Sequence, residues 1–381
     1  KAADALIATV TGGDGNDTIN ASGFDAVLTI SSGSGDDVIT AQSGALALSV
    51  DAGAGDDGIT IVGAQLTDAD TIAGGADTDT ITLSANSATI VDADFTAITG
   101  VEKFTTADGT NSVTLGTIAD GSGLATVTGG SGDDTIDASA FVGSLTISTG
   151  SGGDDEISLG TANGQVNVVD ATNQWTTADT IAGGAGTSDV IQLADDGQTI
   201  VDADFTNVSA IEKLITGNGT NSLSLGTKAD DAGLKTVTGG SGADTINATG
   251  FASGGNTLEI SSGGGIDTIT GATSGSTVIY GGAAVDVITG GGSADKFKYG
   301  STTEMGSSLN SAETITSFTD TSDKIWLAWD GIDFAEDITV SDNGVNTTIQ
   351  INKDGAADGY LQLVGISDSS VITSADFQLG A

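Results

Sequence analysis

The chain repeats one nine-residue pattern along most of its length. The first copy, Gly12–Asn20, reads GGDGNDTIN, with glycine at positions one, two and four, an acid at position six and an aliphatic residue at position eight. Further copies are Ser32–Thr40, Ala52–Thr60, Gly74–Thr82, Gly129–Asp137, Gly150–Ser158, Gly183–Gln192 (one residue longer), Gly239–Asn247, Ser262–Thr270, Gly281–Thr289 and Gly290–Lys298. Such a series predicts a repeat architecture, in which each repeat buries its apolar side against its neighbours.

The spacing of the position-six acids gives the size of one coil. The first four acids follow one another at steps of 20, 20 and 22 residues, at Asp17, Asp37, Asp57 and Asp79. Within one step the sequence predicts a glycine-rich loop, a strand at 18–20, a turn and a second strand at 27–31. The fold class that we expect is therefore all-β, a parallel β-solenoid with two short strands and about 20 residues per coil.

A second, longer repeat is superimposed on the first. The segment that starts at Asp68 returns in similar form from Thr177, and the pentapeptides Val91–Phe95 and Val201–Phe205 are identical. Large units start near residues 6, 124 and 234. We expect residues 1–298 to form the duplicated solenoid and residues 299–381, where the composition changes, to form a β-rich C-terminal cap.

Composition excludes several classes of function. With 52 acidic residues against 9 lysines, the net charge of −43 disfavours nucleic acid as a partner. The chain contains no histidine or cysteine, which excludes imidazole and thiolate metal sites and catalytic triads with a histidine base. An acidic-pair hydrolase is the remaining enzyme hypothesis, but no such pair stands apart from the repeats, so we expect no enzyme. No apolar run approaches the roughly 18 residues of a transmembrane helix.

The repeated acids need a cation. Coils that stack about 4.8 Å apart would place carboxylates in a column, at a cost of roughly 3.5 kcal/mol per adjacent pair at an effective dielectric constant of 20. Carboxylates and loop carbonyls are hard oxygen ligands, which suit Ca²⁺ better than Mg²⁺ or transition metals. The sequence therefore predicts multiple calcium ions as cofactors, mainly along one edge of the solenoid.

The copies resemble the RTX (repeat-in-toxin) nonapeptide G-G-x-G-x-D-x-U-x, a calcium-binding β-roll motif. This resemblance implies metal-site residues at Gly13, Gly15, Asp17, Gly33, Gly35, Asp37, Gly53, Gly55, Asp57, Asp79, Gly130, Gly132, Asp134, Gly153, Asp155, Asp189, Gly240, Gly242, Asp244, Gly263, Gly265, Asp267, Gly282, Asp286 and Asp295. The pattern departs from the family at position four of three copies, where Asp77, Ala284 and Ser293 replace glycine.

The inserts between the repeat blocks, VDADFT followed by VEK or IEK, resemble those of bacterial surface-layer and other secreted cell-surface RTX proteins. The resemblance implies an extracellular coat protein that folds and assembles on binding Ca²⁺, with itself and a cell-surface glycan or lipopolysaccharide as partners. The alternative is a calcium-folded C-terminal secretion or carrier module of a larger RTX adhesin, toxin or secreted enzyme. At Glu102–Lys103 and Glu212–Lys213 we expect exposed ion pairs, with subunit contacts as the alternative.

The C-terminal segment carries its own signals. The stretch ETITSFTDTSDKIWL, which includes Trp326, is similar to the segment that closes many RTX proteins, and this implies a cap that carries a type I secretion signal. The stretches TTIQINKD and GYLQLVGI alternate polar and apolar residues and predict an antiparallel hairpin. We expect Trp326 and Trp329 to lie in the core of the cap rather than to form a ligand platform.

Overall fold

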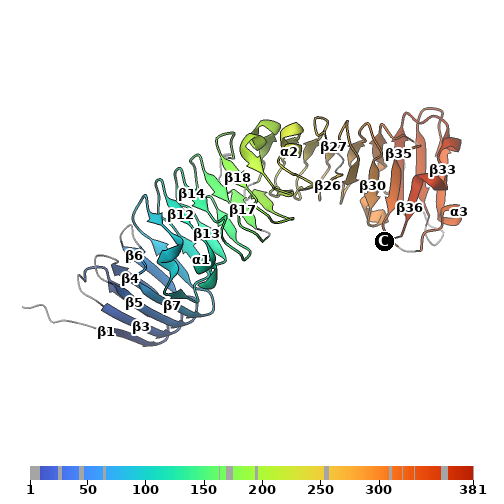
Figure 1. The fold of residues 1–381 in the computed structure, drawn as a ribbon. Coiled ribbons are helices and arrows are strands. Elements are labelled where there is room, and N and C mark those ends of the chain that lie inside the picture. The colour runs from blue at the N-terminus through green and yellow to red at the C-terminus, as the bar shows by residue number, and fades with distance from the viewer. Residues whose placement is uncertain are drawn as a thin grey trace, which may run out of the picture. The chain divides into compact units, whose positions relative to one another are not determined.

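The computed structural model describes residues 9–24, 28–42, 47–62, 66–162, 164–168, 175–193, 196–252, 257–308, 311–319, 321–329, 331–352 and 359–380. The chain divides into two compact units, Lys1–Val190 (unit 1) and Ile191–Ala381 (unit 2), with strand β19 (Val190–Leu193) at the boundary. Both units are parallel β-solenoids, as Figure 1 shows, which confirms the predicted fold class. In the described part of the chain, no helix has the length and apolar character needed to traverse a bilayer.

Three sheets build unit 1. Sheet A contains β1 (Thr9–Asp14), β3 (Leu28–Ser34), β5 (Leu48–Ala54), β7 (Thr71–Ala76) and β10 (Ile98–Thr99). Sheet B contains β2 (Thr18–Ala21), β4 (Val38–Gln42), β6 (Gly58–Val62), β8 (Thr80–Leu83), β11 (Lys103–Thr105), β13 (Thr126–Thr128), β15 (Thr146–Ser148) and β17 (Gln165–Val168). Sheet C contains β9 (Thr89–Ile90), β12 (Ser112–Thr114), β14 (Thr135–Asp137), β16 (Glu156–Ser158) and β18 (Thr180–Ala182).

The register of these sheets follows the sequence repeat. Strand β2 pairs with β4 so that Ile19 lies beside Ile39, and β4 pairs with β6 so that Ile39 lies beside Ile59. These isoleucines are buried, whereas their strand neighbours, such as Thr18, point outward. Burying each such side chain contributes about 1.5–3 kcal/mol. A stack of identical aliphatic residues therefore fixes each coil on the next, because a slip of one residue would expose the whole stack.

The insert at residues 83–125 changes the sheet that faces sheet B. Strand β9 is an additional strand of this coil, and β10 is the last member of sheet A, so sheet C takes over from β9 onward. The insert also contains the 3-10 helix η1 (Asp92–Phe95) and the short helix α1 (Thr117–Gly121). The coil of the insert thus has three strands instead of the two that we predicted.

The two inserts have the same internal contacts. The carboxylate of Asp92 accepts hydrogen bonds from the N–H groups of Gly116 (2.7 Å) and Ala119 (2.9 Å) at the start of α1. In the second insert Asp202, at the start of η2 (Asp202–Asn207), accepts the corresponding bonds at the start of α2 (Thr227–Asp231), from Gly226 (2.7 Å) and Ala229 (3.0 Å). A carboxylate here satisfies helix N–H groups that have no partner within the helix.

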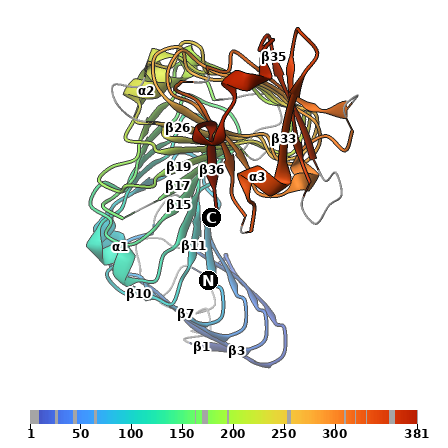
Figure 2. The same cartoon turned by 90° about the vertical axis from the view of Figure 1, so that its right-hand side faces the viewer.

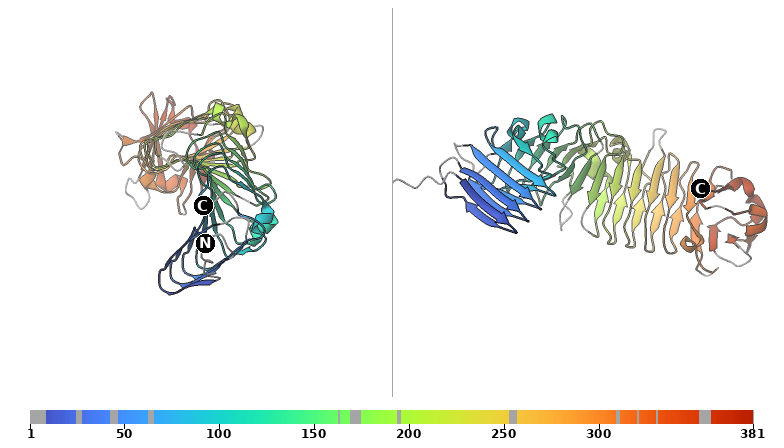
Figure 3. Two further views of the ribbon diagram at one scale, coloured as in Figure 1. Left: turned by 90° about the vertical axis from the view of Figure 1, so that its left-hand side faces the viewer. Right: turned by 90° about the horizontal axis from the view of Figure 1, so that it is seen from below.

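Two sheets build unit 2. Sheet D contains β20 (Thr199–Val201), β23 (Ser222–Ser224), β25 (Thr245–Asn247), β27 (Thr268–Thr270), β29 (Val287–Thr289), β31 (Glu313–Thr316), β35 (Gly359–Val364), β34 (Thr347–Ile351) and β33 (Ile338–Asp342). Sheet E contains β22 (Lys213–Ile215), β24 (Thr236–Thr238), β26 (Leu258–Ser261), β28 (Thr277–Tyr280), β30 (Lys296–Tyr299), β32 (Lys324–Leu327) and β36 (Phe377–Leu379). Figure 3 shows these strands in successive rows. Strand β21 (Val208–Ser209) completes the second insert.

The C-terminal segment continues both sheets of unit 2. The predicted hairpin is strand β34 paired antiparallel with β35, and its turn falls on residues 353–358, outside the described residues. Strand β33 pairs antiparallel with β34, and β31 pairs parallel with β35. Figure 2 shows β33 beside the small helix α3 (Phe334–Asp337). Three further turns of 3-10 helix are η3 (Thr302–Glu304), η6 (Ser369–Val371) and η7 (Ser374–Asp376).

Candidate metal site

The first four position-six acids and Glu102 form a hydrogen-bonded column at the turn from sheet A to sheet B. The backbone N–H of each acid donates to a carboxylate oxygen of the acid one coil later, at 2.7 Å, 2.7 Å, 2.9 Å and 2.8 Å for the pairs Asp17–Asp37, Asp37–Asp57, Asp57–Asp79 and Asp79–Glu102. We call these five residues the first ladder. Each rung after Asp17 uses one oxygen of its carboxylate in a charge-assisted hydrogen bond.

The second oxygen of each central rung has no partner. Oδ2 of Asp37, Asp57 and Asp79 is buried and accepts no hydrogen bond. The glycine at position one preserves the space beside it, because a Cβ added at Gly74 would lie 2.5 Å from Asp79 Oδ2. An ionised oxygen that is buried without a partner carries a large desolvation cost. These oxygens therefore fit a bound cation, which would satisfy them in the space that the missing side chain leaves.

The glycines at positions two and four allow the loops to stack directly. A Cβ added at Gly53 would collide with the carbonyl oxygen of Gly33, and Gly53 has φ +107°, a conformation that other residues rarely adopt. Above this contact the N–H of Gly35 donates to the carbonyl of Ala54 at 2.7 Å. The Gly–Gly pattern is thus needed to bring the carboxylates of neighbouring coils to hydrogen-bonding distance.

A second ladder lies at the turn from sheet B to sheet C and contains Asn111, Asp134, Asp155 and Asp179. Each backbone N–H donates to Oδ1 of the next member at 2.9 Å. The second oxygens are used differently, because Asp134 Oδ2 accepts from the N–H of Gly130 (3.1 Å) and Asp179 Oδ2 accepts from the N–H of Thr176 (2.7 Å). In the second ladder, protein N–H groups therefore donate to the Oδ2 atoms of Asp134 and Asp179, whereas the corresponding Oδ2 atoms of the central rungs of the first ladder accept no hydrogen bond.

A third ladder lies at the turn from sheet E to sheet D in unit 2 and contains Asn221, Asp244, Asp267, Asp286 and Glu313. The N–H groups donate to the next carboxylate at 2.7 Å, 2.7 Å and 2.8 Å, and the N–H of Asp286 hydrogen-bonds to Glu313. Oδ2 of Asp244, Asp267 and Asp286 and Oε2 of Glu313 are buried without a hydrogen-bond partner. The third ladder thus repeats the geometry of the first.

Two predicted ligands stand outside these ladders. Oδ1 of Asp189 accepts from the N–H of Gly164 at 2.6 Å. Asp295 uses both oxygens, accepting from the N–H groups of Thr277 (2.8 Å) and Gly291 (2.5 Å).

The predicted acids do not all lie along one edge of the solenoid. The prediction of calcium mainly along one edge is therefore wrong as far as the positions of the acids are concerned. The first four copies place them before strands of sheet B, whereas the copies at Asp134 and Asp155 place them before strands of sheet C.

Burial changes the acidity of the rungs. It raises the pKa of Asp155 and Asp286 to about 7 and that of Asp79 to about 6, and in each case a backbone hydrogen bond opposes the rise while the neighbouring rung adds to it. The pKa of Asp57 and that of Asp267 are raised for the same first cause. The ladders thus hold carboxyl groups that gain from any positive charge placed beside them.

Several ladder members lack the nonapeptide and were not predicted. Glu102, Asn111, Asp179, Asn221 and Glu313 occupy the same position as the motif acids, but no glycine-rich loop precedes most of them. What they share is a carboxylate or amide two residues before an inward-facing aliphatic or aromatic residue, at the spacing of one coil. That shorter pattern would have revealed them.

The expected ion pair at Glu102–Lys103 is wrong. Neighbouring residues of a strand point to opposite faces, and Glu102 reaches back along the ladder to the N–H of Asp79. In the second insert Glu212 pairs with Lys235 at 3.4 Å rather than with Lys213.

The position-five acids add a second, exposed row beside the first ladder. The N–H of Asp56 donates to Asp36 Oδ1 at 3.1 Å, and the N–H of Thr78 donates to Asp56 Oδ1 at 2.8 Å. These bonds run toward the preceding coil, opposite to those of the position-six acids. The exposed row increases the negative charge close to the buried oxygens.

Two of the three copies without glycine at position four keep a positive φ at that position. Asp77 has φ 77° and Ala284 has φ 98°, although neither is glycine. Both ladders continue past these residues, because Asp57 bonds to Asp79 and Asp267 bonds to Asp286. The departures therefore leave the arrangement of the carboxylates intact but strain the backbone.

Replacing Ala284 by glycine should stabilise the protein by about 1 kcal/mol, because glycine adopts a positive φ without the steric cost of a Cβ. Urea unfolding of the calcium-saturated protein measures this. The matched control is Gly265→Ala at the same position one coil earlier, where φ is +116° and the Cβ would collide with Gly242, so stability should fall. A loss of stability in Ala284→Gly contradicts the strain.

Comparison with known proteins gives a family for the repeats. The family model of the RTX calcium-binding nonapeptide repeat (4 copies) matches residues 9–28, 29–45, 66–87, 117–141, 236–252 and 271–301. No curated protein matches the chain.

Among solved structures, 24 chains match. One is the solution structure of a subunit of the Azotobacter vinelandii mannuronan C5-epimerase, with 19% identity and a TM-score of 0.27 over 38% of this chain and 78% of that chain. These matches show that the chain carries RTX calcium-binding nonapeptide repeats, in segments that lie on the parallel solenoid described above.

Proposed function

We propose that the chain is a calcium-dependent structural protein of the bacterial cell surface, an S-layer or similar extracellular coat. The observation that carries the calcium dependence is the set of buried carboxylate oxygens without hydrogen-bond partners. They occur at Asp37, Asp57 and Asp79 in unit 1 and at Asp244, Asp267, Asp286 and Glu313 in unit 2.

The coordination would combine one carboxylate oxygen per rung with carbonyl oxygens of the glycine loops. Among the described residues no three acidic side chains converge on one point, so backbone carbonyls must complete the shell. Oxygen-only coordination with a flexible number of ligands is the chemistry that Ca²⁺ accepts. When bound, calcium supplies the positive charge that compensates the stacked carboxylates.

Folding would then depend on location. Extracellular calcium modules bind with dissociation constants of about 10⁻⁴–10⁻³ M, far above the free calcium concentration of the cytosol. Inside the cell the ladders would stay uncompensated and the chain unfolded, a state suited to export by a type I secretion system. Outside, millimolar calcium would fill the ladders and stabilise the folded form by mass action.

The similarity of the two inserts favours a structural coat protein over the secretion or carrier module of a larger RTX protein. Asp92 with α1 and Asp202 with α2 repeat one arrangement 110 residues apart, as expected of a chain that grew by duplicating a structural unit. The buried acids of the ladders are held by backbone N–H groups. The chain thus presents repeated, similar surfaces that suit assembly into an ordered layer.

Far-ultraviolet circular dichroism with and without a calcium chelator tests the folding step, and negative-stain microscopy of the same samples tests assembly. We expect β-structure and ordered sheets in millimolar Ca²⁺, and loss of both in chelator, with Mg²⁺ as a poor substitute. Unchanged β-structure in excess chelator would refute the calcium dependence. Calcium-dependent folding into single dispersed chains would instead favour the secretion or carrier module of a larger RTX protein.

A further inference from the structure

The outer face of sheet E carries an unusual cluster near its C-terminal end. Lys296 of β30 pairs in register with Lys324 of β32, and Lys298 pairs with Trp326. The alternate residues of these strands, such as Phe297 and Ile325, are buried in the core. The lysines and the tryptophan therefore point outward and remain partly exposed. The prediction that Trp326 lies in the core of the cap is wrong.

This cluster differs from the rest of the same face. On β24 the outward positions hold Thr236 and Thr238, and on β26 they hold Glu259 and Ser261. Three of the nine lysines of a chain with 52 acids are gathered on β30 and β32. Lysines that face each other on neighbouring strands repel, so sheet stability alone does not account for the arrangement.

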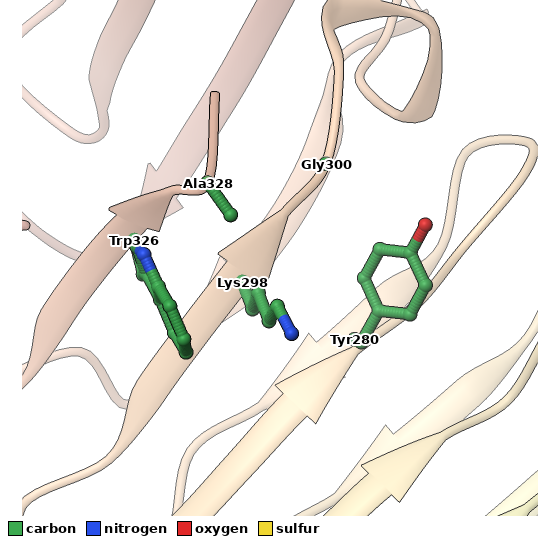
Figure 4. Close-up of a pocket in the computed structure, with 5 residues that line it drawn as sticks. All are labelled: Tyr280, Lys298, Gly300, Trp326 and Ala328. Atoms are coloured by element: carbon green, nitrogen blue, oxygen red, sulfur yellow. The ribbon is translucent and has the colours of Figure 1, made fainter. Parts of the chain in front are cut away.

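Two members of the cluster, Lys298 and Trp326, line an open hollow of about 490 Å³ together with Tyr280, Gly300 and Ala328. Figure 4 shows Lys298 between the two aromatic rings, all on the same side of the strands. The volume lies within the usual range of small-ligand pockets, about 300–1,000 Å³.

Hydrogen bonds hold both aromatic walls in place. Trp326 Nε1 donates to the carbonyl of Gly380 at 3.0 Å, and the hydroxyl of Tyr280 donates to Glu304 Oε1 at 2.7 Å. Gly300 leaves room beside this hydrogen bond, because a Cβ there would lie 3.0 Å from Glu304 Oε1. Oriented, partly exposed rings are a preorganised surface for a flat ligand.

Two lysine ammonium groups lie at the tryptophan wall of this hollow. The Nζ of Lys298 lies 4.7 Å from the centre of the Trp326 ring and that of Lys296 lies 5.9 Å from it. Lys324 is partly compensated by Asp376 at 3.8 Å, and Glu304 is the acid at the tyrosine wall. Among the described residues no carboxylate forms an ion pair with Lys296 or Lys298, so both ammonium groups lie uncompensated at the tryptophan ring in a chain with a net charge of −43.

We infer that this cluster binds an acidic saccharide, with a sugar ring in the hollow against Trp326 and its carboxylate at Lys296 and Lys298. The C–H face of a sugar matches an aromatic wall, and the ammonium groups match a carboxylate. The acidic surface of a second copy would satisfy the charge but would leave the hollow lined by the oriented rings unfilled. The inference names a partner class for the proposed surface protein, but it stands on this cluster and not on the ladders.

The test uses the full chain at saturating calcium and two tetrasaccharides of equal length, hyaluronan tetrasaccharide, which is acidic, and chitotetraose, which is neutral. Isothermal titration should show the acidic probe binding at least tenfold more tightly, with an affinity that falls as salt is raised. The double variant Lys296→Gln with Lys298→Gln should weaken that binding at least tenfold. Trp326→Leu should weaken the binding of both probes.

Lys213→Gln is the matched control, because it removes one lysine from an outward position of the same sheet on β22, away from the cluster. It should leave binding unchanged, and circular dichroism in calcium should be the same for all variants. Equal affinity for the two probes, or insensitivity to the double variant, overturns the inference. So does sedimentation that shows self-association lost in the double variant without saccharide binding, because the occupant is then a second copy. Since every measurement is made in calcium and needs no ordered layer, failure here leaves the proposed function standing.

Discussion

Without calcium, the chain should gain β-structure as the pH is lowered from 7 to 4. The pKa values of Asp155 and Asp286 are raised by burial to about 7, and those of Asp79 and Asp295 to about 6, from an ordinary value of 3.8. Between pH 4 and pH 7 the folded state therefore binds more protons than the unfolded state. Its stability falls as the pH rises through this window and is fully present below about pH 4.

Circular dichroism and urea unfolding in chelator, between pH 4 and 7.5, measure this effect. Asp286→Asn, which mimics the protonated acid, should stabilise the calcium-free protein at pH 7 and flatten its pH dependence. Asp342 is the matched control, because it is exposed and its hydrogen bonds from Ser369 lower its pKa, so Asp342→Asn should not reproduce either change. Calcium-free stability that rises with pH from 4 to 7 would contradict the account, and sedimentation at each pH separates folding from aggregation.

Replacing Gly53 by alanine should open the first coils of unit 1 even in saturating calcium. The added Cβ would collide with the carbonyl oxygen of Gly33, and the alanine would have to adopt φ +107°, which residues other than glycine rarely do. Neither atom can move away, since both belong to backbone that is paired in register across β3 and β5. We expect a local loss of more than about 3 kcal/mol, at the upper end of single-residue effects. In a solenoid such damage stays near its origin.

Amide hydrogen exchange measures the loss directly. Strands β3, β5 and β7 should lose protection, whereas β25, β27 and β29 of unit 2 serve as an internal standard and should keep it. The matched control is Gly58→Ala in the same coil, where the nearest atom to the new Cβ, the carbonyl oxygen of Asp37, is 3.9 Å away. It should be neutral or slightly stabilising. Equal effects of the two substitutions would show that the loops have room to separate.

The coil and its inward residues could be predicted because both depend on local spacing. The 20-residue step became the register of β2 on β4, and Asp37 and Ile39, two residues apart in an extended segment, both point inward. Steric requirements that act within one loop could also be recognised in the sequence. An example is the glycine at position one, which leaves room for the carboxylate at position six.

What the sequence did not reveal depends on pairing between distant segments. The extra strand β9 of the first insert moves later acids to the opposite edge of sheet B, which no single copy of the motif signals. Glu313 is a ladder member because β31 pairs with β29, although its own loop lacks the glycines. The outward position of Trp326 follows from the register of β32 on β30, which places its neighbour Ile325 in the core.

The direction of the ladder bonds makes the two ends of a ladder chemically unequal. Each rung before the last of its ladder donates its N–H toward the coil that follows, as from Asp244 to Asp267 and from Asp267 to Asp286. Removing coils from the N-terminal side would leave only a spare acceptor, which water or a cation can satisfy. Removing them from the C-terminal side would leave an N–H donor that needs a new acceptor, such as water, a carbonyl oxygen or another carboxylate. Each ladder therefore has a direction, and cutting it would expose acceptors on one side of the cut and N–H donors on the other.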